Sequence, residues 1–420
     1  MSCAYFACPL LNLIFTPYSD SMTTSSSPSE AAGGAPVAES NPKSTVAAET
    51  PIALPSILDL SREKLVSEIT EMGEKRFRAD QLWRSLYNDG AESFDEMSTL
   101  SKPFRKSLSE KFSINPLDEA LSLTSADGST SKSLFRLHDG ELIETVLMRY
   151  ESDGHRRNRK TACISTQAGC ALGCTFCATG QQGFRRNLSV GEIVAQVIAM
   201  QRTARAEDEV DIAAGKRTKG ELQGVTNVVF MGMGEPLANY DNTLAAVRVL
   251  NDGQGVNIGA RHITLSTVGL IPEILKLADE ELQINLAISL HAPDNATRSQ
   301  TMPINQRYPV EQLIKACHQY ANKTNRRIFF EYVLLKEQND SIEQAQKLGR
   351  LLNGLHCHVN LIPVNPTKNG PFERTDQSSA RIFQGGLKQY GIPSTIRMEK
   401  GIDINAGCGQ LRDRVISEIS

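Results

Sequence analysis

An alternation of two hydrophobic patterns over residues 160–398 constrains the fold of this 420-residue chain more than any other feature. Short apolar runs recur there, separated by stretches with apolar residues at helical spacing. The expected strands are 161–165, 226–231, 262–267, 284–289, 328–334, 358–362 and 395–398, and the expected helices are 190–202, 242–250, 272–278, 310–321, 342–352 and 379–390. Such alternation is typical of a parallel sheet covered by helices. About six units predict an α/β fold, a partial (β/α)6 barrel of the TIM type.

The residues before the barrel region predict three further segments. A composition rich in Ser, Thr, Ala, Pro and Gly predicts disorder in the first segment. Helical patterns at 61–71, 78–88 and 103–112 define the second, and strand patterns at 133–137 and 141–150 define the third. The predicted domains are a tail (1–53), a small helical domain (54–115), a β-rich connector (116–158) and the barrel region (159–420). Lysines and arginines in the helical domain make it either a plain adaptor or an RNA-docking module.

The charge of the chain gives no sign of a globally basic surface. Its formal net charge is −3, and residues 1–60 hold five acidic residues and one lysine. Residues 61–420 therefore carry 44 basic and 43 acidic residues. Contact with nucleic acid must come from local patches. The candidates are 155–160, Arg185–Arg186 and Arg326–Arg327, and a run of this kind is more often a solvated surface face than a binding site.

The sequence predicts a protein without a membrane span. No apolar stretch reaches the required length. The nine cysteines, an odd number in a large chain, fit a reducing compartment. We expect a cytoplasmic monomer. A plastid address is the second interpretation of the tail, which contains no arginine, and Met22 is an alternative start.

Three cysteines, Cys170, Cys174 and Cys177, stand in a C-x3-C-x2-C arrangement. A structural zinc site takes four ligands, and an iron–sulfur cube normally takes four thiolates. Three close thiolates therefore favour a cube with one open iron, which could bind a small molecule and pass it an electron. The alternatives are a zinc site completed by His138 or His155, and three ordinary buried thiols.

Other residues suited to chemistry fall at the expected strand ends, where barrel enzymes gather their active sites. The run 231–236 combines glycines, which let a ligand approach the backbone, with Glu235, which could accept a hydrogen bond from an ammonium group. A simple Gly–Pro turn explains the same run. The further candidates on strand-end loops are Ser266, Ser289, Leu290, His291 and Asn365.

Three isolated residues have both a reactive and an ordinary interpretation. Cys408 lies between two glycines, which suit either a thiol that must move or a tight loop. Cys163 on the first barrel strand is either reactive or a buried strand cysteine. Glu144 stands among apolar neighbours on a strand, as a desolvated base or as a surface glutamate.

At these motifs the chain resembles the radical S-adenosylmethionine (radical SAM) superfamily, with Phe176 before the last cysteine of the triplet. Over about residues 56–417 it resembles, more specifically, the bacterial RlmN family of radical SAM RNA methyltransferases. The resemblance is carried by residues 73–81, 94–97, 144–146, 181–184, 232–236, 264–267, 289–293, 361–366 and 408–410. The loop 151–160 is longer and more basic than is usual in that family.

The resemblance implies two cofactors and a set of residues that bind them. A [4Fe–4S] cluster would be held by Cys170, Cys174 and Cys177, and its open iron would bind SAM. The implied SAM-binding residues are Gly234, Glu235, Ser266, Ser289, Leu290, His291 and Asn365. The implied partners are 23S rRNA, tRNA and an electron donor of the flavodoxin or ferredoxin type.

The resemblance also implies a reaction at C2 of adenine, with two SAM molecules per turnover. C2 lies between two ring nitrogens and is too electron-poor to attack an electrophilic methyl group. Cys408 would take a methyl group from one SAM, and a radical from the second would convert it into a group that adds to C2. Glu144 would remove the C2 proton. Cys163 would then attack Cys408 sulfur and release the base by forming a disulfide.

Three other functions share parts of this pattern. A Cfr-type relative methylates C8 of adenine in 23S rRNA with the same motifs. A non-catalytic iron–sulfur RNA-binding module would need the cysteine triplet but not Cys408. A radical SAM enzyme acting on a small molecule would not need the helical domain.

Overall fold

The structure is a computed structural model that describes residues 54–151, 158–218, 224–365, 371–397 and 400–411. These residues belong to one compact unit. The predicted tail (1–53), His155 and most of the basic loop 151–160 lie outside the described residues.

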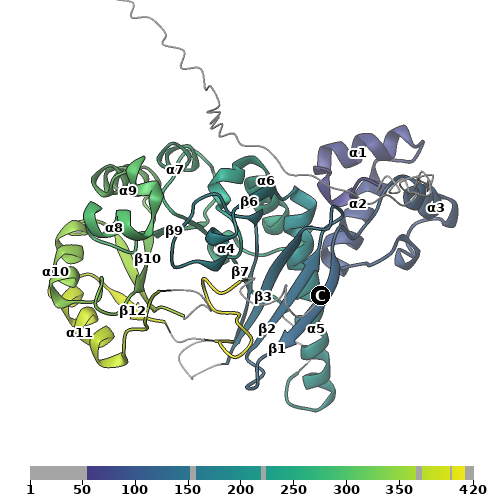
Figure 1. Ribbon diagram of the computed structural model, residues 1–420. Helices are drawn as coiled ribbons and strands as arrows, with labels where there is room; N and C mark the ends of the chain where they lie inside the picture. Colours follow the sequence, from purple (N-terminus) through teal and green to yellow (C-terminus); the bar gives the residue numbers. More distant parts are fainter. Residues whose placement is uncertain (1–53, 152–157, 219–223, 366–370, 398–399, 412–420) are drawn as a thin grey trace, which may run out of the picture. The chain divides into compact units, whose positions relative to one another are not determined.

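A ten-stranded sheet forms the centre of the protein, in the order β1-β2-β3-β4-β7-β8-β9-β10-β11-β12 (Figure 1). The strands are β1 (Asp118–Thr124), β2 (Thr130–Arg136), β3 (Leu142–Tyr150), β4 (Arg159–Cys163), β7 (Asn227–Phe230), β8 (Ile263–Thr267), β9 (Asn285–Ser289), β10 (Ile328–Leu334), β11 (Cys357–Pro363) and β12 (Ser394–Ile396). In this sheet the seven strands from β4 to β12 are parallel to one another, whereas β1, β2 and β3 pair antiparallel. The predicted parallel α/β architecture is therefore confirmed, with seven parallel strands.

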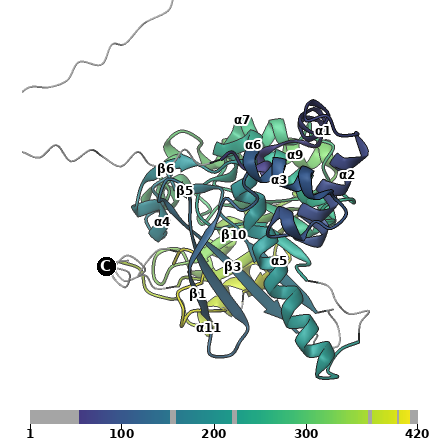
Figure 2. The ribbon, with the colours of Figure 1, turned by 90° about the vertical axis from the view of Figure 1, so that its right-hand side faces the viewer.

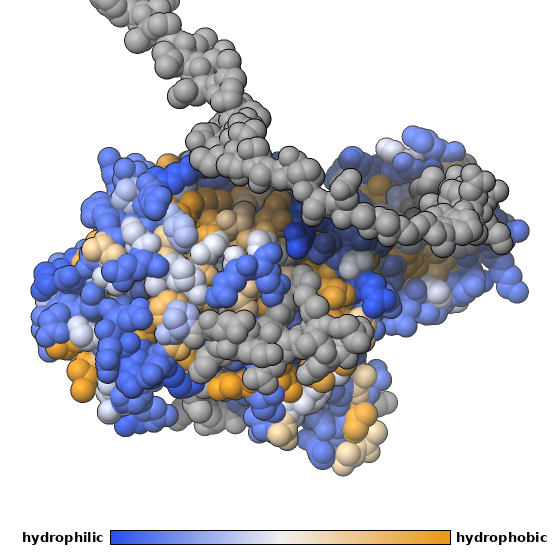
Figure 3. Space-filling view, viewed as in Figure 1, coloured by the Kyte–Doolittle hydropathy of each residue, from blue (hydrophilic) through white to orange (hydrophobic). Residues whose placement is uncertain are grey.

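Helices connect successive parallel strands and cover the outside of the sheet (Figures 1 and 2). The helices are α1 (Arg62–Glu71), α2 (Phe77–Arg84), α3 (Lys102–Lys111), α4 (Ala178–Gln181), α5 (Val190–Ala213), α6 (Tyr240–Asn251), α7 (Ile271–Leu277), α8 (Asn295–Thr301), α9 (Val310–Thr324), α10 (Ile342–Leu351) and α11 (Gln377–Lys388). A separate two-stranded sheet of β5 (Gln167–Gly169) and β6 (Phe184–Asn187) precedes α5. Hydrophilic residues cover most of the rim in Figure 3, and hydrophobic residues show toward its centre.

The first three helices pack against α5 and share its hydrophobic core. Leu82 and Trp83 of α2 belong to the same buried cluster as Val194 of α5. The backbone N–H of Gly191 donates to Asp59 Oδ1 at 2.7 Å, in the first turn of α5. Serines cap two of these helices: Ser61 accepts from the N–H of Lys64 at the start of α1, and Ser101 accepts from the N–H of Phe104 at the start of α3.

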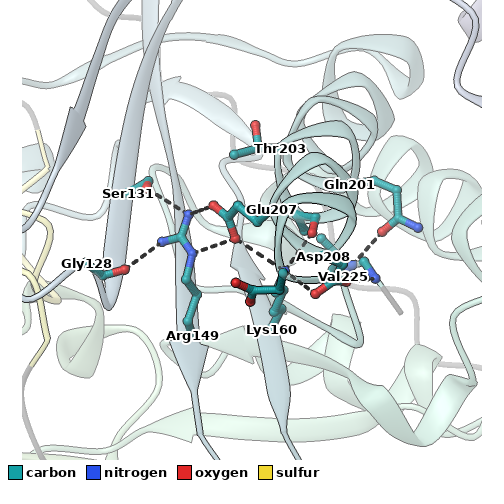
Figure 4. Close-up of polar contacts among 12 residues, drawn as sticks. Gly128, Ser131, Arg149, Lys160, Gln201, Thr203, Glu207, Asp208 and Val225 are labelled. Carbon is teal, nitrogen blue, oxygen red and sulfur yellow. Dashed lines mark hydrogen bonds and ion pairs between the residues drawn. The ribbon is translucent and has the colours of Figure 1, made fainter. Parts of the chain in front are cut away.

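Helix α5 continues eleven residues beyond the predicted end at Arg202. Its later turns lack an apolar stripe, so hydrophobic periodicity does not reveal them. Ion pairs stabilise them instead (Figure 4): Glu207 binds Arg149 of β3, and Lys160 Nζ of β4 lies 2.9 Å from Asp208 Oδ1. The pKa of Glu207 is lowered overall. Burial alone would raise this pKa, but the hydrogen bonds from Arg149 and the charges of Arg149 and Lys160 outweigh burial.

Strand β1 was not predicted from the sequence, because it lies at the edge of the sheet and buries little. Its residues alternate between exposed and half-buried positions, and Asp118 and Glu119 open it. Pairing with β2 creates the strand rather than its own apolar pattern. None of the helices in the described ranges combines the length and apolarity that crossing a bilayer requires.

The buried ion pairs at α5 give a prediction about stability. Asp208 is 1% exposed, and its carboxylate binds Lys160 and Arg217. Removing this carboxylate leaves two cations with one acidic partner each, Glu207 for Lys160 and Asp211 for Arg217. Because the network is buried, Asp208→Ala should lower the free energy of unfolding in urea by about 3 kcal/mol. The control is Asp241→Ala, which breaks an exposed pair with Lys276 and should cost less than about 1 kcal/mol. Equal losses would contradict the argument.

Candidate active site

The register of the sheet places residues from many strands on one face. Cys163 of β4 lies opposite Val146 of β3 and Val229 of β7. Directly paired residues point to the same side of a sheet, and so do residues two apart on one strand. Glu144, two residues from Val146, therefore shares a face with Cys163. By the same rule, Ser266, Ser289 and Glu331 lie on this face as well. The opposite face meets α5, where Thr145 donates to Gln196 at 2.7 Å.

The three cysteines of the triplet lie on one loop between β5 and α4. The backbone N–H of Cys177 donates to the carbonyl of Cys174 at 3.1 Å, and the N–H of Cys170 donates to the carbonyl of Gly183 at 2.9 Å. Burial raises the pKa of the Cys170 thiol to about 11, and the charge of Cys177 adds to the effect. Burial and the charges of Cys177 and Cys170 raise the pKa of Cys174. The three thiols therefore lie within electrostatic range of one another.

The donor set of this loop fits an iron–sulfur cube. In a cube each thiolate binds a different iron, and the metal compensates the repulsion between neighbouring thiolates. Within the described ranges, no three His, Cys, Asp or Glu side chains are grouped around a position for a single metal ion. His138, one histidine considered for zinc, has its Nδ1 3.5 Å from Glu192 Oε1 instead.

Glu235 lies in the loop after β7, near the triplet. Its Oε1 accepts from the N–H of Leu237 at 3.0 Å, and its Oε2 accepts from the N–H of Val268 at 2.9 Å. Burial raises its pKa to about 7 despite these bonds. Its charge in turn raises the pKa of Cys170 and Cys174. The carboxylate is thus held in place by backbone donors near the triplet.

Gly234 is required by packing against the protein itself. Its φ is 97°, and a Cβ there would lie 2.5 Å from the Cβ of Gln167. Any larger residue would separate the loop after β7 from the loop before the triplet. The glycine therefore brings Glu235 close to the cysteines.

The predicted residues on β8 and β9 meet at the ends of their strands. Ser266 Oγ and Ser289 Oγ are 3.4 Å apart. Leu290 is fully buried and its N–H donates to the carbonyl of Glu331 at 3.1 Å. The two hydroxyls therefore lie on the inner face, whereas the side chain of Leu290 fills the core.

His291 has a left-handed backbone, with φ of 58°, and a buried ring. Its Nδ1 accepts from the N–H of Val333 at 3.0 Å, so in the neutral ring the proton sits on Nε2. Burial, and then the charge of Arg298, lower its pKa to about 3. The ring also meets Phe176 edge-on, with centroids 4.9 Å apart. His291 thus packs directly against the loop of the triplet.

Asn365 connects the end of β11 to the segment that carries Cys408. Its Nδ2 donates to the carbonyl of Cys408 at 3.3 Å, while its Oδ1 is buried without a hydrogen-bond partner. A buried acceptor without a partner is costly, so this oxygen is free for a ligand donor.

Residues 400–411, here called the C-terminal loop, bring Cys408 to the triplet. The backbone N–H of Ala178, next to Cys177, donates to the carbonyl of Gly409 at 2.8 Å. A Cβ on Gly407 would lie 2.5 Å from Asn365 Nδ2, so glycine permits close packing here rather than only motion. Cys408 is exposed to solvent, although the surrounding protein raises the pKa of its thiol by desolvation. The thiol therefore reaches solvent from a position surrounded by protein.

The two isolated cysteines lie within electrostatic range of each other. Burial is the main cause that raises the pKa of Cys163, and the charge of Cys408 is the second. The charge of Cys177 in turn raises the pKa of Cys408, while Arg397 opposes it. Cys163, Cys408 and the triplet, which are distant in the sequence, therefore meet in one place.

Glu144 is fully buried and forms an ion pair that the sequence did not indicate. Lys132 Nζ of β2 lies 3.0 Å from Glu144 Oε1. The burial of Glu144 thus agrees with the expectation of a desolvated carboxylate and contradicts the expectation of a surface glutamate. Lys132 was missed because it stands in a polar run, Thr130–Ser133, that has no apolar alternation.

A second group that the sequence did not indicate lies on β10 and β11. Glu331 Oε1 accepts from Asn360 Nδ2 at 2.8 Å, and its Oε2 is buried without a hydrogen-bond partner. Burial raises the pKa of Glu331, and Arg397 partly opposes the effect. Its charge also raises the pKa of Cys408. A single glutamate inside the strand pattern 328–334 carries no signal that separates it from a structural residue.

One described residue from each of two predicted basic patches is engaged in ion pairs within the protein. Arg186 binds Glu192 with two bonds of 2.7 and 2.8 Å and also pairs with Asp139. Lys160 belongs to the ion-pair network in Figure 4. These residues hold β6, β4 and α5 in place, so their charges are already compensated.

Two family models match the chain. The model described as the radical SAM superfamily matches residues 164–349, and the model described as the ribosomal RNA large subunit methyltransferase N-terminal domain matches residues 56–114. A Bacillus licheniformis protein, "Probable dual-specificity RNA methyltransferase RlmN", is 48% identical over 85% of this chain and 93% of its own length. The chain belongs to the RlmN family of radical SAM methyltransferases.

Two further relatives agree with this membership. The Bacillus subtilis protein of the same description is 46% identical over 88% of this chain and 96% of its own length. The crystal structure of a radical SAM methyltransferase from Sphaerobacter thermophilus has a TM-score of 0.79 and 45% identity, covering 86% of this chain and all of that one. The chain is therefore an enzyme of the radical SAM methyltransferase type, and its family implies a [4Fe–4S] cluster and SAM.

The buried neutral state of His291 predicts a dependence of stability on pH. The folded protein resists protonation of the ring until pH is near 3, whereas the unfolded chain takes up the proton near 6.5. This contribution to stability is present above pH 6.5 and is lost as pH falls toward 3, with a slope of at most about 1.4 kcal/mol per pH unit. His291→Asn, which tolerates the left-handed backbone, should flatten the pH dependence of urea unfolding. His262→Asn, at an exposed position, should leave it unchanged.

Proposed function

We propose that this chain methylates C2 of a specific adenine in 23S rRNA and in tRNA, through a methylated Cys408. The observation that supports the proposal is the proximity of Cys163 and Cys408 to each other and of Cys408 to the cysteine triplet, with Glu144 on the same face of the sheet as Cys163. A cluster enzyme for small molecules or a non-catalytic RNA-binding module would not need this second pair of thiols. The relatives described as dual-specificity RNA methyltransferases support the two RNA classes.

The proposal assigns each cofactor to residues of this site. Cys170, Cys174 and Cys177 would hold the cluster. SAM would lie along the inner ends of the strands, near Gly234, Glu235, Ser266, Ser289, Leu290, His291 and Asn365. The cluster and SAM, when bound, would supply the methyl group and the radical chemistry. Asn365 Oδ1 and the imidazole Nε2–H of His291 offer one acceptor and one donor for this purpose.

Cys408 has the surroundings of a nucleophile that is activated on binding. Desolvation raises the pKa of its thiol, and the charge of Arg397 opposes this effect. A cationic ligand near the thiol would favour the thiolate for the same reason that Arg397 does. The bond of its carbonyl to Asn365 fixes the backbone of the loop while the side chain reaches solvent.

Glu144 and Cys163 would act after the methylene carbon has joined C2. The carboxylate of Glu144 takes the C2 proton, and the unpaired electron that the addition leaves on the ring would return to the bound cluster. The sulfur of Cys163 attacks Cys408 Sγ, the S–C bond breaks, and its electron pair stays on the methylene carbon, which takes up a proton. The product carries a methyl group, and the two cysteines form a disulfide that an external thiol reduces.

The remaining parts of the proposal concern domains and partners. The described helices before residue 115 would dock RNA, the connector 116–158 would supply Glu144, and residues 159–420 would form the catalytic core. The electron would come from a flavodoxin or ferredoxin, and we propose a monomer. No described contact favours C8 over C2, so the product decides between them.

The test of this function is an assay of the anaerobically reconstituted protein with SAM on 23S rRNA fragments and tRNA. We expect methylation at adenine C2, identified by mass spectrometry, and its complete loss in Cys408→Ala. The matched control is Cys317→Ala, a buried cysteine of α9 that should retain activity. A C8 product, or a protein that holds zinc instead of iron and sulfide, would overturn the proposal.

Cys163→Ala should trap a covalent complex between Cys408 and RNA. Without the second thiol, nothing attacks Cys408 Sγ, and the S–C bond to the base persists. A band of protein-bound RNA should accumulate on denaturing gels to about one equivalent of enzyme. Cys357→Ala, a buried cysteine of β11, should not accumulate it. Free RNA alone in the Cys163→Ala reaction would exclude Cys163 from the release step.

A further inference from the structure

Lys132 is the charged partner of Glu144 inside the sheet. Its side chain is 4% exposed and that of Glu144 is 0% exposed, and their charged atoms lie 3.0 Å apart. Taking two charges out of water is expensive, and a buried ion pair commonly adds little net stability. Net stability therefore does not explain why this ion pair is buried.

The register places Lys132 in line with the reactive residues. Lys132 of β2 pairs with Val146 of β3, and Val146 pairs with Cys163 of β4. The side chains of these three residues share one face, and Glu144 lies on it two residues from Val146. The ammonium thus reaches Glu144 from the side of the sheet on which the thiols gather.

A second contact joins Lys132 to the C-terminal loop. Its Nζ donates to the carbonyl of Asn405 at 3.3 Å, three residues before Cys408. The same loop is anchored nearby, because the N–H of Ala126 donates to Asp403 Oδ2 at 2.8 Å. A Cβ on Gly401 would lie 2.7 Å from Thr130, so the loop packs closely on β2.

We propose that Lys132 is a positioning residue that holds Glu144 as a carboxylate and ties it to the seated C-terminal loop. One ammonium then serves two purposes: it keeps the base ready for a proton, and it fixes the base relative to Cys408. The inference rests on the proposed function, because it assigns Lys132 a part in the step that removes the C2 proton.

Two charged or titratable groups are placed beside Glu144 by its printed contacts and by the sheet register. Lys132 of β2 pairs with it, and Cys163 of β4 lies on the same face of the sheet. Lys132 is the cation of the two. Loss of its charge should therefore raise the pKa of Glu144, and removal of the C2 proton should require a higher pH.

The experiment is a single-turnover reaction of the reconstituted Lys132→Met enzyme with SAM and RNA. Cys408 should still become methylated, as mass spectrometry of the protein would show. The covalent RNA complex should form and then decay at least about 10-fold more slowly than in wild type at pH 7. In a plot of decay rate against pH, the acidic limb should move to higher pH by about one to three units. Lys132→Arg should restore most of the rate, because it keeps the charge.

A double-mutant cycle separates positioning from independent effects. If Lys132 acts through Glu144, Lys132→Met should have little further effect on complex decay in a Glu144→Gln enzyme. If each substitution slows complex decay by its own factor and the two factors multiply in the double variant, the inference is wrong. So would an unshifted acidic limb in Lys132→Met.

The matched control is Lys160→Met, which removes another buried lysine from the neighbouring strand β4 (Figure 4). It should lower the stability of the fold and leave the acidic limb in place. If it moves the limb as far as Lys132→Met does, the effect is structural and the inference fails. A wild-type enzyme that makes no methyladenine would overturn the proposed function itself, whereas an active wild type with an unshifted Lys132→Met limb overturns only this inference.

Discussion

The seating of the C-terminal loop on three separate parts of the chain is the interaction on which the candidate site depends. Its backbone is held by α4 through Ala178, by the end of β11 through Asn365 and by β2 through Lys132. Each contact is a hydrogen bond of ordinary length, and none alone would order a loop. Together they place one thiol between the cysteine triplet and Cys163. Without the loop the barrel keeps its cysteine triplet but loses Cys408, the proposed nucleophile.

The antiparallel strands added to the barrel have a complementary part. They extend the inner face of the parallel sheet, so that a carboxylate from β3 stands beside a thiol from β4. The far side of the same strands is tied to α5 by Thr145 and by the ion pairs around Lys160. The polar contacts thus fall into two sets. One set fixes the sheet to its helices, and the other meets the place where we propose RNA and SAM react.

The sequence predicted the fold well in segments whose apolar residues follow one helical or strand periodicity. The seven parallel strands and most of the helices between them were predicted, because burial gives these elements a clear apolar pattern, whereas the short helices α4 and α8 were missed. Strand β1 and the last turns of α5 were missed because pairing and ion pairs, rather than apolar patterns, create them. The triplet was recognisable because its ligands are local in sequence.

The rest of the site depended on contacts that spacing does not encode. Whether Glu144 and Cys163 share a face is decided by strand register, and a shift of one residue would separate them. Lys132 and Glu331 carry no sequence signal, since each is one charged residue within a strand. The proximity of Cys163 and Cys408, more than 200 residues apart, came only from the fold.

The order of synthesis gives the C-terminal loop one more consequence. Residues 400–411 follow every strand of the sheet in the sequence. During translation the cysteine triplet therefore emerges more than 200 residues before Cys408. The proposed nucleophile is the last cysteine of the site to be synthesised, so it is absent while the triplet first becomes available to iron.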